Sequence, residues 1–517
     1  RDLVRSRGLG DVYKRQVLFR GGEEGEIRKN LIENNHIDAI IGLPANIFFG
    51  TGIPTIIMVL RQKRENTDVL IIDASKGFIK EGKNNKLRAS DIKRIADTFI
   101  KRESIPKFSR VVSREEIRSN DYNLNIPRYV DSSEAAEHWD VYASMFGGIP
   151  TAEIDEMSEF WTAFPALKKA LFTESGIPYV NVSTPDIKSA IKSHPDVVGF
   201  ENAFNAAFST FPAFLKEELI DRMGSIEISK AETVLSADIF ERLKEIPLID
   251  KYAAFQLLDD DWTGISIDLE MLQTEGFAAT KKVDPNLVIK KKDGKDQEVQ
   301  EGWVGHIIPF DLVQATLLSA ETDELHGLES RLAEIPSEYE SILDEMTEED
   351  KESCNDVLTE EGDAFVPKEV SKKIKELKKD RSPESVALRT LLEKVESLIK
   401  SEKEIKAEIK AKSAALQAKT KDTIESLSDE QALDLLEKKW IAPLIESIHK
   451  LPDTVIDSLV SKIQALQNKY ATTFFEVEQQ ISENEATLSG MIDDLEGNEY
   501  DMLGLKELKK LLGGSAE

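Results

Sequence analysis

Apolar residues in the first quarter of the chain form short, uninterrupted runs. The stretch "AIIGLPANIFFGTGIPTIIMVL" (39–60) has no charged residue between Asp38 and Arg61. Its length suits a membrane-spanning helix, but prolines and glycines interrupt its middle and would leave backbone groups unpaired in lipid. Two strands, "AIIGL" and "TIIMVL", joined by the loop 44–54 are the better interpretation. Neither run alternates, which is typical of strands buried on both faces. We expect no membrane span here.

The neighbouring segments continue this pattern in strand–helix–strand order. "VLF" (17–19) predicts a strand, and "DVLIIDAS" (68–75) predicts another. Between them, "EEGEIRKNLIENN" (23–35) predicts a helix with an acidic first turn. Its apolar face would carry Ile27, Leu31 and Ile32. Such alternation predicts an α/β fold, the C-terminal part of a doubly wound, Rossmann-like sheet. In these sheets the loops at strand ends form the site.

After residue 131 the apolar period changes to that of helices. Residues 132–324 predict a mostly helical middle domain, with a hairpin over 287–300 that turns at Asp293-Gly294. One broad apolar helix face carries four phenylalanines, which we interpret as core rather than as cofactor contacts. They are Phe204, Phe208, Phe211 and Phe214.

Residues 325–517 predict long charged helices with coiled-coil-like seams. Apolar side chains recur at spacings of three and four in 386–416, and a second set follows in 456–497. Prolines punctuate these helices and favour several shorter antiparallel pieces over one rod. The seams have two interpretations: a self-contained helical hairpin, or a docking surface for a partner's helices. The prolines are Pro383, Pro443 and Pro452.

Charge separates the two ends of the chain. The 517 residues carry a net charge of −29. Residues 1–130 hold 25 Lys and Arg against 17 Asp and Glu, whereas the remainder carries −37. The acidic rear excludes direct contact with a nucleic-acid backbone along it. The single cysteine, Cys354, excludes an internal disulfide framework and fits a small buried thiol in a reducing cytosol.

These residues carry a resemblance to a known family. The segment "VLFRGGEEGEIRKNLIENNHIDAIIGLPANIFFGTGIPTIIMVL", followed by "VLIIDAS" and "NDYNLNIPRYVD", is similar to the modification subunit of type I restriction-modification systems. That family consists of adenine-specific DNA methyltransferases. The resemblance is close over 17–131, and "LIDKYAAFQLL" (248–258) is also similar to a downstream segment of longer members. It implies a sheet that binds S-adenosylmethionine and transfers a methyl group to N6 of an adenine flipped out of the duplex.

The resemblance also implies candidate site residues. Phe48 is the best positional match to the aromatic side chain that closes one face of the flipped base, and Phe49 is the second. The alternative is that both phenylalanines are core residues beneath the loop. Arg128 is a candidate contact to a DNA phosphate, with packing of the Arg128-Tyr129 pair as the alternative.

Two motifs of the family are absent from this sequence. We find neither a glycine-rich cofactor loop nor an Asn-Pro-Pro-aromatic or Asp-Pro-Pro-aromatic motif. "GGEEG" (21–25) opens with acidic residues and lacks the Lys-Ser/Thr of a phosphate loop. We therefore expect no catalytic and no cofactor-binding residue in the chain. Residues 1–16 have no initiator Met and no periodicity, and we interpret them as a non-native leader. The expectation is an N-terminally truncated, inactive fragment with an unpaired strand edge near Val17.

Metal binding is not predicted. "DDDWTGISIDLE" (259–270) places Asp259, Asp261, Gly264 and Glu270 at calcium-loop positions, but Thr263 stands where Asp or Asn is needed. The six histidines are scattered without metal-ligand spacing.

The function that follows is adenine methylation by a parent complex in the cytoplasm. The resemblance implies DNA, a specificity subunit, a restriction subunit and a second modification subunit as partners, with S-adenosylmethionine as cofactor. Two alternatives remain open: a non-catalytic scaffold, or a single-chain defence methyltransferase in which the middle domain reads DNA. That last alternative needs a basic, aromatic-interleaved surface that the middle domain does not show.

Overall fold

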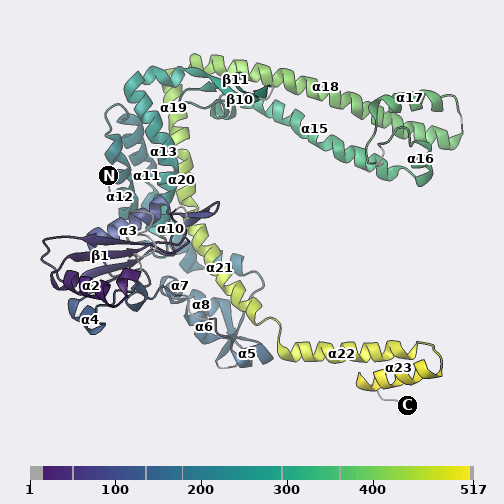
Figure 1. Cartoon of the computed structure of the whole chain (residues 1–517). Helices are drawn as coiled ribbons and strands as arrows, with labels where there is room; N and C mark the ends of the chain where they lie inside the picture. The colour runs from purple at the N-terminus through teal and green to yellow at the C-terminus, as the bar shows by residue number, and fades with distance from the viewer. Residues whose placement is uncertain are drawn as a thin grey trace. The chain divides into compact units, whose positions relative to one another are not determined.

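The chain divides into two compact units. The computed structural model describes residues 16–48, 52–133, 137–176, 178–292, 295–359, 363–380 and 382–512. The first unit comprises residues 1–212, 229–263 and 444–517, and the second comprises 213–228 and 264–443. Figure 1 colours the chain by residue number and labels its elements.

A four-stranded sheet forms the start of the first unit. Its order is β2-β1-β3-β6, with β1 and β3 parallel and both outer strands antiparallel to their neighbours. The strands are β1 (Ile37–Gly42), β2 (Ile56–Leu60), β3 (Val69–Asp73) and β6 (Ser109–Val112).

Each face of this sheet is covered by a helix. Ile40 and Ile71 belong to one core cluster together with Ile32 of α2 (Glu23–Glu33). Ile41 and Ile72 belong to a second cluster, which includes side chains of α3 (Ala89–Lys101). Successive strand residues point to opposite faces. The structure therefore has an α/β layer of the predicted class, followed by a helical region.

The individual strand predictions have different outcomes. Every residue of β1 is buried, as its unbroken apolar pattern predicts. The prediction that β2 is buried on both faces is wrong: Ile57 is 47% and Leu60 55% exposed, because β2 pairs only with β1 at one end of the sheet. Within α2, Ile32 is buried but Ile27 is exposed, so the predicted apolar face is narrower than expected.

The predicted strand 17–19 is also wrong. Residues Gln16–Leu18 form a 3-10 helix, η1, and the Leu18 carbonyl accepts a hydrogen bond from the Leu124 amide at 2.8 Å. Leu18 is fully buried in the core although its backbone is not extended. The predicted unpaired strand edge near Val17 is also wrong: among the described strands, β2 is the edge strand next to β1.

The rest of the first unit is mostly helical, as predicted, with two small sheets. The hairpin β4 (Ile79–Glu81) with β5 (Asn84–Lys86) follows β3. A second sheet has the order β7-β9-β8, from Ile149–Pro150, Tyr179–Val182 and Phe172–Glu174. The short helices are α4 (Arg114–Ser119), η2 (Ile126–Arg128), α5 (Val141–Phe146), α6 (Thr151–Asp155), α7 (Ser158–Ala163), α8 (Leu167–Leu171) and α9 (Ile187–Lys192). The later helices are α10 (Pro195–Phe208), α12 (Ile228–Arg242), α20 (Ala442–His449), α21 (Leu451–Lys469), α22 (Phe474–Asp493) and α23 (Glu499–Leu511).

Three of the four phenylalanines in the predicted stripe are core, as predicted, whereas Phe214 is only partly buried. Phe204, Phe208 and Phe211 are each at most 1% exposed, and Phe204 stacks on Phe208 with ring centroids 4.8 Å apart. The calcium-like segment lies on one continuous helix, α13 (Lys251–Glu275), where the twelve-residue loop of a calcium site cannot form.

Long helices and one hairpin build the second unit. The predicted hairpin is confirmed by the antiparallel pair β10 (Val283–Lys292) and β11 (Lys295–Gly305), whereas its turn at Asp293-Gly294 lies outside the described residues. The helices of this unit are η3 (Lys216–Asp221), η4 (Phe277–Lys281), α14 (Phe310–Thr316), α15 (Ser319–Glu345), α16 (Glu348–Ser353), α17 (Pro367–Leu377), α18 (Pro383–Glu425) and α19 (Asp429–Trp440). The short helix α11 (Phe211–Leu215) joins residues of both units.

Helix α18 runs antiparallel to α15. The Tyr339 hydroxyl donates to Glu402 at 3.1 Å, and Lys394 lies 3.5 Å from Glu345. The apolar seam at the start of α18 is buried by side chains of α15, of α17 and of the connections between them, and Cys354 lies in the same cluster, buried as predicted. This chain itself therefore covers that part of the 386–416 seam.

Candidate functional site

The loops that follow β1 and β3 lie at one edge of the sheet. Because β1 and β3 are parallel, they end at the same edge, at Gly42 and Asp73. We call this the carboxyl edge. Ligands of open α/β sheets bind outside the carboxyl ends of the strands. The Leu43 amide donates to the Thr55 carbonyl at 2.9 Å and closes the loop 44–54 at its base.

Phe48 lies on this loop and is not a core residue. Its side chain is 45% exposed, and it lines a groove of about 480 Å³ whose walls are mainly apolar. Phe49 lies outside the described residues. The groove is lined by Val17, Leu43, Phe48, Thr55, Ile56, Ile57 and Met58.

Thr55 contributes a buried polar atom to the same groove. The residue is 3% exposed, and within the part of the chain that the structure describes its Oγ1 has no hydrogen-bond partner. An unsatisfied buried hydroxyl costs about 1–3 kcal/mol, and a ligand group in the groove would remove that cost. Thr55 was not predicted from the sequence, where its one signal is a polar residue at the start of an apolar run.

The hairpin β4–β5 fixes the first turn of the loop 44–54. The Asn85 amide donates to the Asn46 carbonyl at 2.9 Å, and Asn85 Nδ2 donates to the Ala45 carbonyl at 2.7 Å. Asn46 has a φ of +54°, a left-handed conformation that asparagine tolerates better than most residues. Two hydrogen bonds from one residue therefore hold the turn that precedes Phe48. Nothing in the sequence pattern indicated this contact.

Arg128 and Tyr129 have different environments. Tyr129 is 5% exposed, its hydroxyl donates to the Asn123 carbonyl at 2.6 Å, and burial raises its pKa. Arg128 is exposed and donates one long hydrogen bond, of 3.3 Å, to Asn120 Oδ1. Tyr129 is therefore a packing residue, whereas the guanidinium of Arg128 is accessible to solvent.

A second cavity adjoins the carboxyl end of β3. It has a volume of about 390 Å³, and Asp73 in its wall accepts hydrogen bonds from the Ser132 hydroxyl at 2.5 Å and the Ser75 amide at 3.1 Å. Four cationic side chains line this cavity against two carboxylates. The cations are Lys76, Arg88, Arg94 and Lys107.

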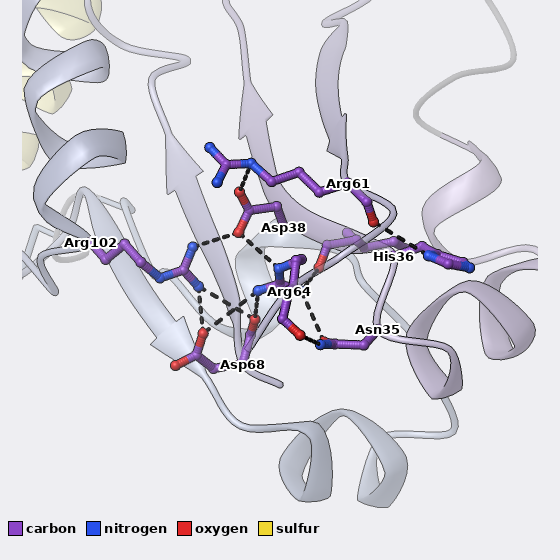
Figure 2. Close-up of polar contacts among 8 residues, drawn as sticks. Asn35, His36, Asp38, Arg61, Arg64, Asp68 and Arg102 are labelled. Carbon is purple, nitrogen blue, oxygen red and sulfur yellow. Dashed lines mark hydrogen bonds and ion pairs between the residues drawn. The ribbon is translucent and has the colours of Figure 1, made fainter. Parts of the chain in front are cut away.

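A charged cluster lies at the opposite edge, where β1 and β3 begin. Figure 2 shows three arginines converging on Asp38, which is buried. Arg61 lies 2.9 Å, Arg64 3.1 Å and Arg102 2.7 Å from its carboxylate oxygens. A β-bulge in the pairing of β1 with β2 leaves Asp38 without a cross-strand partner, which re-aims its side chain. We call these four residues, together with Asp68, the arginine cluster.

The arginine cluster has the features of a structural latch. The Arg64 side chain is only 5% exposed and also donates to the carbonyl of Ile37 at 2.5 Å. Burial lowers the pKa of the Arg64 guanidinium, and Asp38 opposes that shift. Asp68 pairs with Arg102 at 2.5 Å, so the buried Arg64 and the partly buried Arg102 each have a carboxylate partner. Its position at the amino ends of the strands, away from the carboxyl edge, also favours a structural role.

The described residues form neither a metal-ligand cluster nor a membrane-spanning helix. Among the residues that the structure describes, no group of three His, Cys, Asp or Glu side chains is placed to hold a metal ion. Over the same residues, no helix is both long and apolar enough to span a bilayer.

The part of the chain that holds the sheet is similar to known proteins. Residues 8–138 match the family model described as N-6 DNA Methylase. The methylase subunit of the type I restriction enzyme MpnII from Mycoplasma pneumoniae is 39% identical over 126 residues, 24% of this chain and 23% of that protein. The methylase subunit of the type I enzyme MjaVII from Methanocaldococcus jannaschii is 40% identical over 139 residues, 26% of this chain and 24% of that protein.

A solved structure is similar over the same share of the chain. It is the methyltransferase subunit of a type I restriction-modification system from Streptococcus thermophilus, 53% identical, covering 23% of this chain and 25% of that one, with a TM-score of 0.23.

The predicted resemblance to type I methylase subunits is therefore confirmed over this segment. The match begins within the segment 1–16 that we expect to be a leader. The chain spans about a quarter of the length of the curated relatives it matches.

Proposed function

We propose that this chain is part of the modification subunit of a type I restriction-modification system, an adenine-specific DNA methyltransferase. In this proposal the loop 44–54 forms one wall of the pocket for the flipped target adenine. The observation that carries it is the half-exposed Phe48 beside a buried Thr55 hydroxyl that lacks a partner in the described chain. Because the substrate is cellular DNA, the protein would act in the cytoplasm.

The groove offers what a flipped base needs. Stacking of one base on an aromatic side chain contributes about 1–3 kcal/mol, and a half-exposed Phe48 leaves a ring face available for it. A hydroxyl can donate to or accept from the edge of the base, which would satisfy Thr55. The apolar walls of the groove, which include Leu43 and Met58, suit the apolar surface of a planar base.

The described residues do not fit S-adenosylmethionine, the cofactor that we propose for the parent activity. The turn at Gly21-Gly22 follows a 3-10 helix and not a strand, and α2 begins with Glu23, Glu24 and Glu26. Three carboxylates at a helix N-terminus disfavour the anionic end of a cofactor. We assign no catalytic residue here and propose that this chain alone transfers no methyl group.

Photocrosslinking tests the base pocket. A duplex with one mismatched 5-iodouracil offers a base that is cheap to flip, and irradiation joins it to a stacked aromatic side chain. We expect the crosslinked peptide to contain Phe48. Phe48→Leu should reduce the yield about tenfold, the loss of roughly 1.4 kcal/mol of stacking. Phe146→Leu is the matched control, because Phe146 is also exposed, at 57%, but lies on α5. Equal yields from both variants would refute the pocket.

We propose that the partner interaction implied by the resemblance lies on α22. Its apolar positions recur with alternating spacings of three and four, as in a coiled-coil seam. All five apolar side chains of the seam are between 37% and 62% exposed, so the described chain leaves it largely uncovered. The seam consists of Phe474, Val477, Ile481, Asn484, Leu488 and Met491.

Charge selects the kind of partner for this seam. Helix α22 carries five acidic and no basic side chains, so pairing two copies would bring like charges together. We propose a partner helix flanked by Lys and Arg, supplied by the specificity subunit. Asn484, at a core position, would fix the register of the pair.

Co-purification with a specificity subunit tests this docking. Ile481→Asp with Leu488→Asp should abolish co-elution on size exclusion, whereas Ile100→Asp on α3, where Ile100 is 76% exposed, should leave it intact. Retained assembly of the α22 double variant would contradict the proposal.

A further inference from the structure

The connection from β3 to α3 is the most basic short segment of the sheet region. "KGFIKEGKNNKLR" (76–88) carries five basic residues and one acidic residue in a chain of net charge −29. All five basic side chains are exposed. A local basic patch on an acidic protein is the electrostatic mark of a site for a polyanion.

The centre of this segment is the hairpin β4–β5. Glu81 pairs with Asn84 across the two-residue turn Gly82-Lys83. Gly82 has a φ of +62°, which a glycine at the first position of such a turn adopts without strain. The turn presents Lys83 at the tip of the hairpin, away from the sheet core.

The hairpin is joined to the loop that carries Phe48. Asn85 makes the two hydrogen bonds to Ala45 and Asn46 described above. Lys80 is the cross-strand partner of Asn85, and directly opposed residues share one face of a β-ribbon. Lys80 therefore lies on the face of the hairpin that meets the loop.

The lysines of the hairpin differ in their partners. Lys86 lies 3.2 Å from Glu81, and Arg88 lies 3.0 Å from Asp91. Lys80 and Lys83 have no carboxylate partner in the described part of the chain. Two exposed ammonium groups without an internal partner are the ones available to an external anion.

The cavity behind the hairpin extends the basic surface. Lys107 in its wall has a φ of +60°, a conformation that costs a lysine backbone strain. Strained residues concentrate at ligand sites. Lys76 and Arg88, at the two ends of the segment, line the same cavity.

We propose that the hairpin Ile79–Lys86 binds the DNA backbone beside the target base, with Lys80 and Lys83 contacting phosphates. Asn85 is a positioning residue that couples the bound backbone to the loop 44–54. The inference rests on the proposed function, because it needs DNA as substrate. Phosphate backbone is favoured over an acidic protein surface because the hairpin is hydrogen-bonded to the loop that carries Phe48, and the strand carrying a flipped base must pass this loop.

Salt-dependent binding of a labelled DNA duplex to the full chain tests the phosphate contacts. The logarithm of the binding constant falls with the logarithm of salt concentration by about 0.9 per phosphate contact. Lys80→Gln with Lys83→Gln should make this slope shallower by about 1.8 and weaken binding roughly 10- to 100-fold at 0.1 M salt. Lys290→Gln with Lys291→Gln, on the hairpin β10–β11, makes the same charge change and is the control.

The outcomes separate this inference from the proposed function. If both lysine double variants give the same salt slope, the hairpin does not bind DNA phosphates and this inference is overturned, even when the Phe48 crosslink persists. If Phe48→Leu leaves the crosslink yield unchanged while the lysine double variant still gives a shallower salt slope, the base pocket alone is overturned. Absence of DNA binding by the wild-type chain overturns both. If poly-L-glutamate binds as tightly as the DNA duplex, and this binding is lost in the Lys80→Gln, Lys83→Gln variant, the ligand of the hairpin is an acidic protein surface and not DNA.

The role of Asn85 has its own readout. Asn85→Leu keeps roughly the size of the side chain, adds no charge and removes the donor to Ala45, so the Phe48 crosslink should fall severalfold while the salt slope is unchanged. Asn84→Leu is the control, since the Asn84 side chain makes no contact with the loop among the hydrogen bonds of the described residues. A Phe48 crosslink in Asn85→Leu equal to that of the control, or a loss of slope in parallel with the crosslink, would overturn the positioning role.

Discussion

Substitution of Asp38 by asparagine should open the sheet locally. Asp38 is buried and receives Arg61, Arg64 and Arg102. Asparagine keeps the shape of the side chain but removes its charge, so three guanidinium groups would face one another. An arginine cannot escape by losing its proton, because its pKa stays above the physiological range even when buried.

The exposure of each arginine sets the free-energy cost of the Asp38→Asn substitution. The Arg61 side chain is 57% exposed, so its pair contributes at most about 1 kcal/mol. Arg102 keeps Asp68 at 2.5 Å. Arg64 is 5% exposed, and Asp68, at 3.8 Å, is its remaining carboxylate among the described residues, beside the uncharged carbonyls of Ile37 and Asp68. Removing one partner of a buried pair costs about 3–5 kcal/mol. The compensation from Asp68 favours the lower end, about 3 kcal/mol.

Hydrogen exchange followed by mass spectrometry measures this cost locally. None of the five tryptophans lies in 17–131, so intrinsic fluorescence would not report on the sheet. Loss of about 3 kcal/mol should accelerate exchange of the β1 and β3 amides roughly 100-fold. Asp155→Asn, which removes an exposed pair with Lys168, should change exchange little. A rate for Asp38→Asn within about threefold of wild type would refute the latch.

Two further predictions concern packing and pH. In Gly42→Ala the new Cβ would lie 2.7 Å from Ile126 Cδ1, so we expect a loss of about 1–3 kcal/mol in unfolding free energy, which Ile126→Val should partly restore in thermal unfolding. The pKa of His306 is raised by its hydrogen bond to Asp284 and by a second to Glu275. A raised folded-state pKa gives stability that is complete below about pH 6.5, the unfolded value, and lost as pH rises through the folded pKa. Exchange of β10 and β11 amides should therefore accelerate from pH 6 to 8 beyond the intrinsic rate, and His306→Gln should remove that excess.

The fold class could be predicted from the sequence because buried segments show as runs or stripes of apolar residues. Unbroken apolar residues correctly indicated β1, and the phenylalanine spacing correctly indicated a core helix face. The same signal failed for β2, since an apolar run does not reveal whether a strand lies inside a sheet or at its end. It also failed at 17–19, where three apolar residues are too few to separate a strand from a 3-10 helix.

The candidate site was only partly predictable. The resemblance located Phe48, but contacts between distant segments carry no local signal. Asn85 reaches Ala45 across 40 residues, and the arginine cluster joins positions as far apart as Asp38 and Arg102. One general clue existed: a charged residue beside an apolar run, such as Asp38, must have partners if it is buried.

The hydrogen bond between Leu43 and Thr55 divides the chain into parts with different tolerance to changes in length. Residues added between 45 and 53 would lengthen a loop whose ends stay paired, at a cost that grows only slowly with length. One residue added within β2 would instead turn each following side chain to the opposite face and carry the apolar wall of the groove away from Phe48. Relatives of this protein can thus vary the reach of the loop freely, while the strand that follows it must keep its length to the residue.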